Sequence, residues 1–111
     1  SGGGDNVVHG TVHWDNDGTY ANFGDKNSLS NGIFANEFHV FSIIWNEQSI
    51  SWYRDDIKYN EIDITPSALS EFHQEFFFIF NAAVGGNWPG SPNSETVFPQ
   101  TMIVDYVRVF Q

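Results

Sequence analysis

The chain has 111 residues, enough for one domain with a modest core, and 17% of them are aromatic, far more buriable surface than a disordered segment carries. Its 14 acidic residues against 4 basic ones give a formal charge of −10, which argues against nucleic acid and anionic membranes as partners. The absence of cysteine excludes disulfides and thiolate metal sites. The longest apolar run, residues 76–80, is about a quarter of the roughly 20 residues that a membrane helix needs.

Alternating polar and apolar residues, enriched in β-branched and aromatic types, predict strands along the whole chain. In chain order the predicted strands are residues 7–14, 19–23, 38–45, 49–54, 57–63, 75–84 and 102–110. The dipeptide Asp55-Asp56 and the tripeptide at 46–48 predict hairpin turns. We therefore expect the middle of the chain to form an antiparallel meander.

One short helix is predicted after this meander. Thr65 precedes Pro66 and the residues S-A-L-S-E, a pattern typical of a capped helix start with proline at the first position, and we expect about two turns. Clustered glycines and prolines make residues 85–97 a predicted surface loop. Because no repeat, low-complexity tract or linker interrupts the chain, we expect residues 1–111 to form a single unit.

Strand parity sorts side chains by face, because neighbouring residues point to opposite sides of a sheet. In the first predicted strand His9, Thr11 and His13 share a polar side, opposite an apolar side that includes Trp14. In the sixth, Asn81 interrupts an otherwise apolar side. This pattern is typical of a sandwich in which one sheet presents a solvated, ligand-facing surface.

Asp105 is anomalous in the last predicted strand. It shares its side with Ile103, Val107 and Val109. A carboxylate on an apolar face is costly unless it is paired, hydrogen-bonded or coordinated to a cation. We therefore expect a compensating partner for Asp105.

Five segments carry a resemblance to a known family. In chain order they are V-H-G-T-V-H-W (8–14), F-H-V-F-S-I-I-W (38–45), I-S-W-Y-R-D-D (50–56), N-A-A-V-G-G-N-W-P-G (81–90) and M-I-V-D-Y-V-R-V-F (102–110). Their order and spacing closely resemble those of bacterial laminarinases, the endo-β-1,3-glucanases of glycoside hydrolase family 16. The resemblance covers the second half of the family domain. It implies an all-β fold, an antiparallel β-sandwich or jelly roll of the concanavalin A-like lectin and glucanase type, present here as a partial domain.

The resemblance also implies a retaining glycosidase that uses two carboxyl groups and a covalent glycosyl-enzyme intermediate. In the family these carboxyl groups lie in a strand motif, Glu-x-Asp-x-x-Glu, shortly before the segment that residues 2–14 resemble, so we expect this chain to start just after it. The six residues from Glu61 to Pro66 match the first Glu and the Asp of this motif. The sixth is proline, which cannot donate a proton, where the motif has its second Glu. Glu61 and Asp63 share a strand face, but a solvated strand end is the preferred interpretation, and no catalytic residue is assigned.

Substrate-binding roles follow from the resemblance for three residues. His13 resembles a cleft position that contacts sugar near the cleaved bond, Asn81 an asparagine that hydrogen-bonds a substrate hydroxyl, and Trp88 a loop aromatic at the cleft wall. Asp105 resembles a carboxylate that helps to hold a structural calcium ion away from the cleft, while the family's other calcium ligands are backbone groups or N-terminal to this segment. The chemistry itself implies no cofactor.

Two other metal hypotheses are disfavoured by geometry and spacing. Four strand steps separate His9 from His13 by roughly 13 Å, too far to share one ion. The residues D-N-D-G at 15–18 resemble a calcium loop, but Lys26 occupies the place of its bidentate glutamate, so a hairpin turn is the preferred interpretation.

Structural alternatives stay open at several of these positions. For His13 the alternative is a solvated sheet histidine, and for Asp105 it is a carboxylate capped by backbone amides. Trp14 and Trp45 are expected in the core, because buried aromatics in a sandwich are commoner than sugar platforms. Trp52 fits either environment.

Three hypotheses for function follow. The first is part of a β-glucan hydrolase that supplies cleft wall and is inactive alone. The second is a non-catalytic, lectin-like β-glucan-binding module. The third is a truncated fragment whose strand edges pair with another copy or with a complementing N-terminal half.

The expected partner is a β-glucan polysaccharide, with β-1,3, mixed-linkage and galactan substrates all open. The parent protein is expected to be extracellular or periplasmic, although residues 1–6 lack the regions of a signal peptide.

Overall fold

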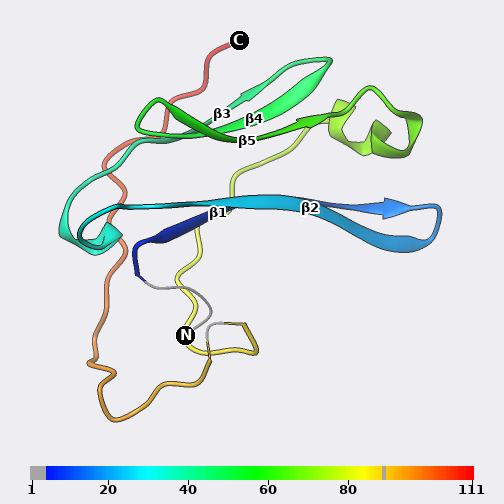
Figure 1. Ribbon diagram of the computed structural model, residues 1–111. Coiled ribbons are helices and arrows are strands. Elements are labelled where there is room, and N and C mark those ends of the chain that lie inside the picture. The colour runs from blue at the N-terminus through cyan, green and yellow to red at the C-terminus, as the bar shows by residue number, and fades with distance from the viewer. Residues whose placement is uncertain (1–4, 89) are drawn as a thin grey trace. The chain divides into compact units, whose positions relative to one another are not determined.

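The computed structural model describes residues 5–88 and 90–111, and its strands form two antiparallel sheets (Figure 1). In the first sheet β1 (Val7–Asn16) pairs with β2 (Thr19–Ser28). The second has the order β3-β4-β5, from β3 (Phe41–Trp45), β4 (Ser49–Arg54) and β5 (Ile57–Asp63). The chain divides into two compact units, one ending at Phe77 and the other running from Phe78 to Gln111, and these strands lie in the first.

Tight turns join the strands where the sequence predicted them. Asp55 and Asp56 have φ values of 47° and 67°, and Asp17 and Gly18 have 53° and 80°. Two successive left-handed residues match the twist of a two-residue hairpin, and aspartate and glycine tolerate that conformation best. The predicted turn at 46–48 is also present, since Asn46 Oδ1 accepts hydrogen bonds of 2.9 Å from the backbone of Gln48 and Ser49.

A small apolar core lies between the two sheets. It is formed by side chains from β1, β4, β5 and the segment that follows β5: Val12, Ile50, Ile62, Ile64, Leu69 and Phe72. Trp14 and Trp52 pack against this cluster, so Trp14 is confirmed as a core residue and Trp52 joins it. The first unit is therefore an antiparallel β-sandwich, which confirms the predicted fold class.

Polar contacts also tie the two sheets together. Asn60 is 8% exposed, and its side-chain amide donates to the Gly10 carbonyl oxygen at 2.9 Å. In a second contact, Arg54 Nε donates to Asn27 Oδ1 at 2.7 Å. Because each contact joins β4 or β5 to the β1–β2 hairpin, they help to set how one sheet lies over the other.

The predicted helix is a 3₁₀ helix, η2 (Ser67–His73), with Pro66 at its N-cap rather than at its first position. Leu69 has non-helical dihedrals in its middle, and both Leu69 and Phe72 are buried. A second 3₁₀ turn, η1 (Phe34–Asn36), was not predicted. Three residues are too few to leave a periodic pattern in the sequence.

Several predicted boundaries were wrong. The first two strands extend to Asn16 and Ser28, beyond their predicted ends, and β3 starts at Phe41 rather than at residue 38. The sequence also predicted Trp45 to be a core residue, but its exposed fraction is 37%. Its indole nitrogen donates a hydrogen bond of 3.0 Å to the carbonyl oxygen of Phe72.

The predicted strands at 75–84 and 102–110 are absent from the described structure, whose backbone is irregular there. A strand exists only through hydrogen bonds to a neighbouring strand, and alternation alone does not supply one. Large apolar side chains of both segments, such as Phe77 at 83% and Phe110 at 87%, are exposed.

In the second unit, the loop predicted at 85–97 is irregular in its described residues. Gly85, Gly86 and Gly90 have positive φ, and Asn93 Oδ1 accepts a hydrogen bond from the backbone of Glu95. Across the described residues of the whole chain, no helix has the length and apolarity to span a bilayer.

Candidate functional site

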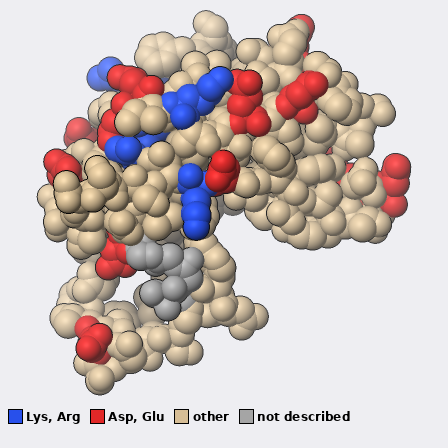
Figure 2. Space-filling view, viewed as in Figure 1, with Lys and Arg blue, Asp and Glu red and all other residues tan. Residues whose placement is uncertain are grey.

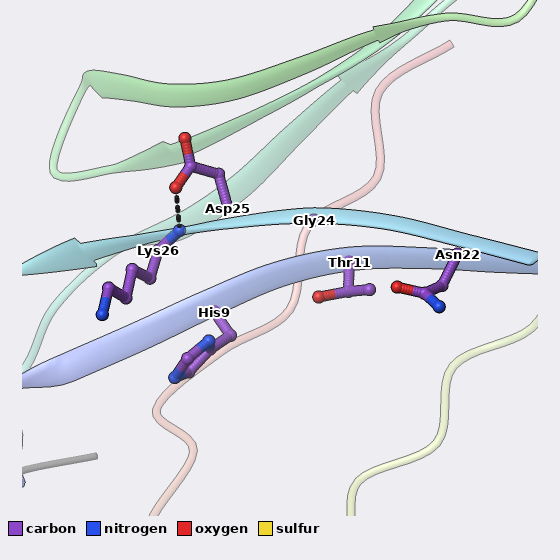
Figure 3. A pocket seen from close by; sticks show the side chains of 6 residues that line it. All are labelled: His9, Thr11, Asn22, Gly24, Asp25 and Lys26. Atoms are coloured by element: carbon purple, nitrogen blue, oxygen red, sulfur yellow. Dashed lines mark hydrogen bonds between the residues drawn. The ribbon is translucent and has the colours of Figure 1, made fainter. Parts of the chain in front are cut away.

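The β1–β2 hairpin carries a polar face with a shallow cavity of about 330 Å³ (Figure 3). The register places His9 opposite Lys26, Thr11 opposite Gly24, and His13 opposite Asn22. All of these except His13 line the cavity, together with Asp25. We call this surface, from His9 and Lys26 to His13 and Asn22, the hairpin polar face.

Period-two alternation explains why this face is polar. Gly10 and Val12 are buried against the core, whereas His9, Thr11 and His13 are exposed on the opposite side of β1. The parity predicted from the sequence is thereby confirmed. The core fixes one side of the hairpin and leaves the other available for a ligand.

His13 is held by a neighbour that sequence reasoning missed. Its Nδ1 lies 2.5 Å from the Tyr20 hydroxyl, and the two rings stack with centroids 5.7 Å apart and an interplanar angle of 26°. Tyr20 is the cross-strand partner of Asp15, which lies on the same face as His13. The hairpin turn predicted at 15–18 therefore implied that Tyr20 lies close to His13. With Nδ1 engaged, Nε2 is the imidazole nitrogen that can bond a ligand.

Thr11 and Gly24 shape the middle of the cavity. A Cβ atom at Gly24 would lie 2.4 Å from Thr11 Oγ1 and 2.9 Å from Thr11 Cγ2, so the threonine lies across the space that any larger residue would fill. Thr11 and Asn22 offer hydroxyl and amide groups at this point, which can both donate and accept hydrogen bonds.

Asp25 lines the cavity but does not direct its charge into it. Figure 3 shows its carboxylate extending to the side of the hairpin opposite to His9 and Thr11, and its Oδ1 accepts a hydrogen bond of 2.7 Å from the Lys26 backbone. Elsewhere, on the side of the molecule drawn in Figure 2, basic side chains lie beside acidic ones. Among the ion pairs of the described residues, Lys58 Nζ lies 2.9 Å from Glu61 Oε2.

Glu61 and Asp63 share the exposed face of β5, as predicted, but both are held as anions. A 2.6 Å hydrogen bond from Ser51, with the nearby Lys58 ammonium, lowers the pKa of Glu61. Hydrogen bonds from the Thr65 hydroxyl and backbone lower the pKa of Asp63. A glycosidase proton donor needs a raised pKa, so neither environment suits that role.

The other predicted site residues lie in the second unit. Asn81 is exposed in irregular backbone, so the strand parity used to orient it does not apply. Trp88 is 66% exposed in the 85–97 loop. That these two residues join His13 in one cleft stays a prediction.

Asp105 is exposed, so the desolvation cost that called for a cation is absent in this structure. Within residues 5–88 and 90–111, no group of three or more histidines and carboxylates has the geometry to hold a metal ion. One exposed carboxylate does not make a calcium site, because calcium takes six to eight oxygen ligands. The D-N-D-G sequence forms the β1–β2 turn, in which Asp15 Oδ2 accepts a hydrogen bond from the Gly18 backbone.

An antiparallel sandwich with one polar strand face is an architecture of jelly-roll domains, a class that includes lectins. The family model described as glycosyl hydrolases family 16 matches residues 1–108, and the chain belongs to this family. The resemblance seen in the sequence motifs is thereby confirmed.

Three curated relatives match over nearly the whole chain. Over 94% of its own length, the chain is 38% identical to the clotting factor G alpha subunit of Tachypleus tridentatus. Over the same share of its length, it is 35% identical to glucan endo-1,3-beta-glucosidase A1 of Niallia circulans. It is 36% identical to a beta-glucanase of Rhodothermus marinus over 95%. The chain spans only 15%, 17% and 40% of these relatives, respectively.

Proposed function

We propose that the chain is part of a retaining endo-β-1,3-glucanase of laminarinase type, in which the hairpin polar face forms a wall of the substrate cleft. The observation that carries this proposal is His13, exposed on the hairpin and oriented by the 2.5 Å contact with Tyr20. Relatives named as glucanases, at 35% and 36% identity, support a β-glucan as the substrate.

In this proposal the chain's own residues bind and orient the polysaccharide. His13 Nε2, Thr11 and Asn22 bond sugar hydroxyls, and the tyrosine fixes the histidine ring, so little rotamer freedom is lost on binding. Asn81 and Trp88 also contact the polysaccharide in this proposal, and Asp105 contributes one oxygen to a structural calcium site completed by other ligands. The parent protein acts outside the cytoplasm, where such polysaccharides occur.

The two carboxyl groups that cleave the bond come from outside this chain. The acid protonates the leaving oxygen, and the nucleophile forms a glycosyl ester that water then hydrolyses with net retention. Glu61 and Asp63, both held as anions, do not replace that pair. The chain alone therefore binds glucan without cleaving it.

The test is a calorimetric titration with laminarin, with reducing sugar measured in the same samples. The chain should bind laminarin and release no reducing sugar, and His13→Ala should weaken binding about tenfold, which corresponds to about 1.4 kcal/mol. Thr19→Ala is the matched control, because Thr19 is exposed on the same hairpin but on the opposite face.

Equal losses in the two variants, or no binding by the unaltered chain, would contradict the proposal. Turnover at ordinary enzyme rates would instead point to Glu61 and Asp63. The lectin-like alternative shares the binding result, and differs in predicting that the full-length parent also releases no sugar.

A further inference from the structure

We propose that the His9 and Lys26 end of the hairpin polar face selects β-glucans that carry an anionic substituent, either a carboxylate-bearing acyl group or a sulfate ester. The inference rests on the proposed function for the neutral part of the ligand. It adds a charged subsite at the end of the face remote from His13.

Lys26 and His9 are direct cross-strand partners and line the same cavity. Side chains opposite each other on one face of an antiparallel pair are about 5 Å apart at Cβ, close enough for one anionic group to contact both. Figure 3 shows both side chains on the side of the hairpin that also carries Thr11 and Asn22. The subsite is therefore continuous with the surface proposed to bind sugar.

Lys26 gives this subsite an ammonium group, although the whole chain carries a formal charge of −10. The one acid that lines the cavity, Asp25, directs its carboxylate to the opposite side and bonds the Lys26 backbone. Lys58 and Arg54, in contrast, form ion pairs of 2.9 and 3.1 Å with Glu61 and Asp55. In the described part of the chain no such ion pair engages the ammonium of Lys26, so it can meet an anion on a ligand.

Thr11 and Gly24 explain why the anion belongs to a polysaccharide and is not a free ion. They form the next cross-strand pair along the face, and the threonine hydroxyl lies over the glycine within the same cavity. A sugar ring placed there would bond Thr11 and Asn22 while a substituent on that ring, or on the next, reaches Lys26. An isolated exposed ammonium binds a free anion only weakly, so the neutral contacts are needed for affinity.

The experiment compares neutral laminarin with laminarin of the same length carrying succinyl groups or sulfate esters, by calorimetry at low and high salt. The unaltered chain should bind the anionic glucans about two- to fivefold more tightly at low salt, the range expected of one exposed ion pair. High salt should remove the difference. This preference would oppose the repulsion between a polyanion and an acidic protein, so general charge attraction cannot produce it.

Lys26→Gln should abolish the preference, so that the variant binds anionic and neutral glucans with equal affinity. Lys58→Gln is the control, since it removes the same charge from β5 and should alter neither affinity. Equal affinities for neutral and anionic glucans, or equal losses in the two variants, would overturn the inference and leave the proposed function intact. Failure to bind any of the glucans would overturn both.

Discussion

At the residue scale, Asp55 connects the β4–β5 turn to the start of β3. Its carboxylate bonds His39 Nδ1 at 2.6 Å, the Val40 backbone at 2.9 Å and an Arg54 guanidinium nitrogen at 3.1 Å. The His39 side chain is only 7% exposed and meets the Phe34 ring edge-on, with centroids 5.0 Å apart. The pKa of Asp55 is lowered mainly by the hydrogen bond from His39. The hydrogen bonds from Val40 and Arg54 lower it further.

Asp55→Asn should destabilise the fold by about 1 kcal/mol near neutral pH, a low value for a bond to a charged group because the carboxylate is 36% exposed. Because the folded-state pKa of Asp55 lies below its ordinary value of 3.8, the stabilisation is fully present above that value. It is lost as pH falls through the folded-state pKa. Urea unfolding of both proteins between about pH 7 and pH 3 should show the gap narrowing only below about pH 4.

The control for this substitution is Asp56→Asn. Asp56 is the second left-handed residue of the same turn, and asparagine tolerates that conformation equally well. Its stability should stay within about 0.5 kcal/mol of the unaltered chain at every pH. A gap for Asp55→Asn that is constant with pH would show that the carboxylate's charge is not what stabilises the turn.

At the element scale, β1 packs so closely against β4 that one position accepts only glycine. A Cβ atom at Gly10 would lie 2.7 Å from two ring atoms of Trp52 and 3.0 Å from the Tyr59 hydroxyl. Gly10→Ala should therefore displace the indole from the core and cost about 1–3 kcal/mol, measured by urea unfolding. Thr11→Ala, at the next position but on the exposed face, should cost under about 0.5 kcal/mol. Equal costs would mean that the two sheets separate freely at this point.

The strand bounds that were predicted correctly belong to strands whose turns and alternation lie within one short segment. β4 and β5 were predicted with the bounds they have, because alternation and the turn at Asp55 both lie within a short stretch. The same alternation at 75–84 and 102–110 predicted strands that the structure lacks, since pairing depends on a neighbouring strand. η2 was placed correctly but is a 3₁₀ helix, because burial of Leu69 and Phe72 sets its local geometry.

In the candidate site, too, locally determined features were predicted correctly and features that depend on two segments were not. Parity alone placed His13 on the exposed face, because one buried neighbour, Val12, fixes the orientation of the strand. Tyr20 and Lys26 were missed as site residues, since their relation to β1 depends on the hairpin register, which is a property of two segments together. The hairpin turn predicted at 15–18 implied that the second strand returns beside β1, and the exact register then decided which of its residues lie opposite His9 and His13.

At the scale of the whole molecule, β3 forms one edge of its sheet and exposes apolar groups on both faces. Ile43 is 50% and Ile44 is 55% exposed. Exposed, apolar edge strands pair readily with other strands. We therefore expect the isolated chain to associate, and its sedimentation-average mass to rise with concentration.

Ile44→Lys should weaken this association at least about tenfold, because a charge on an edge strand disfavours pairing with another copy. Ile33→Lys is the control, since Ile33 is equally apolar, is 37% exposed and lies outside both sheets. A mass that stays monomeric over the whole concentration range would contradict the expectation. The same shift in both variants would place the contact elsewhere.

The alternation along β1 has a practical consequence for engineering. Val12 and Trp14 touch the core, whereas His9, Thr11 and His13 are exposed on the other side, so randomising these three residues would sample new ligand preferences at little cost to folding. A display library confined to these codons, with Gly10, Val12 and Trp14 held constant, should retain a high fraction of folded clones. The hairpin is thus a natural starting point for the directed evolution of reagents that discriminate among glycans.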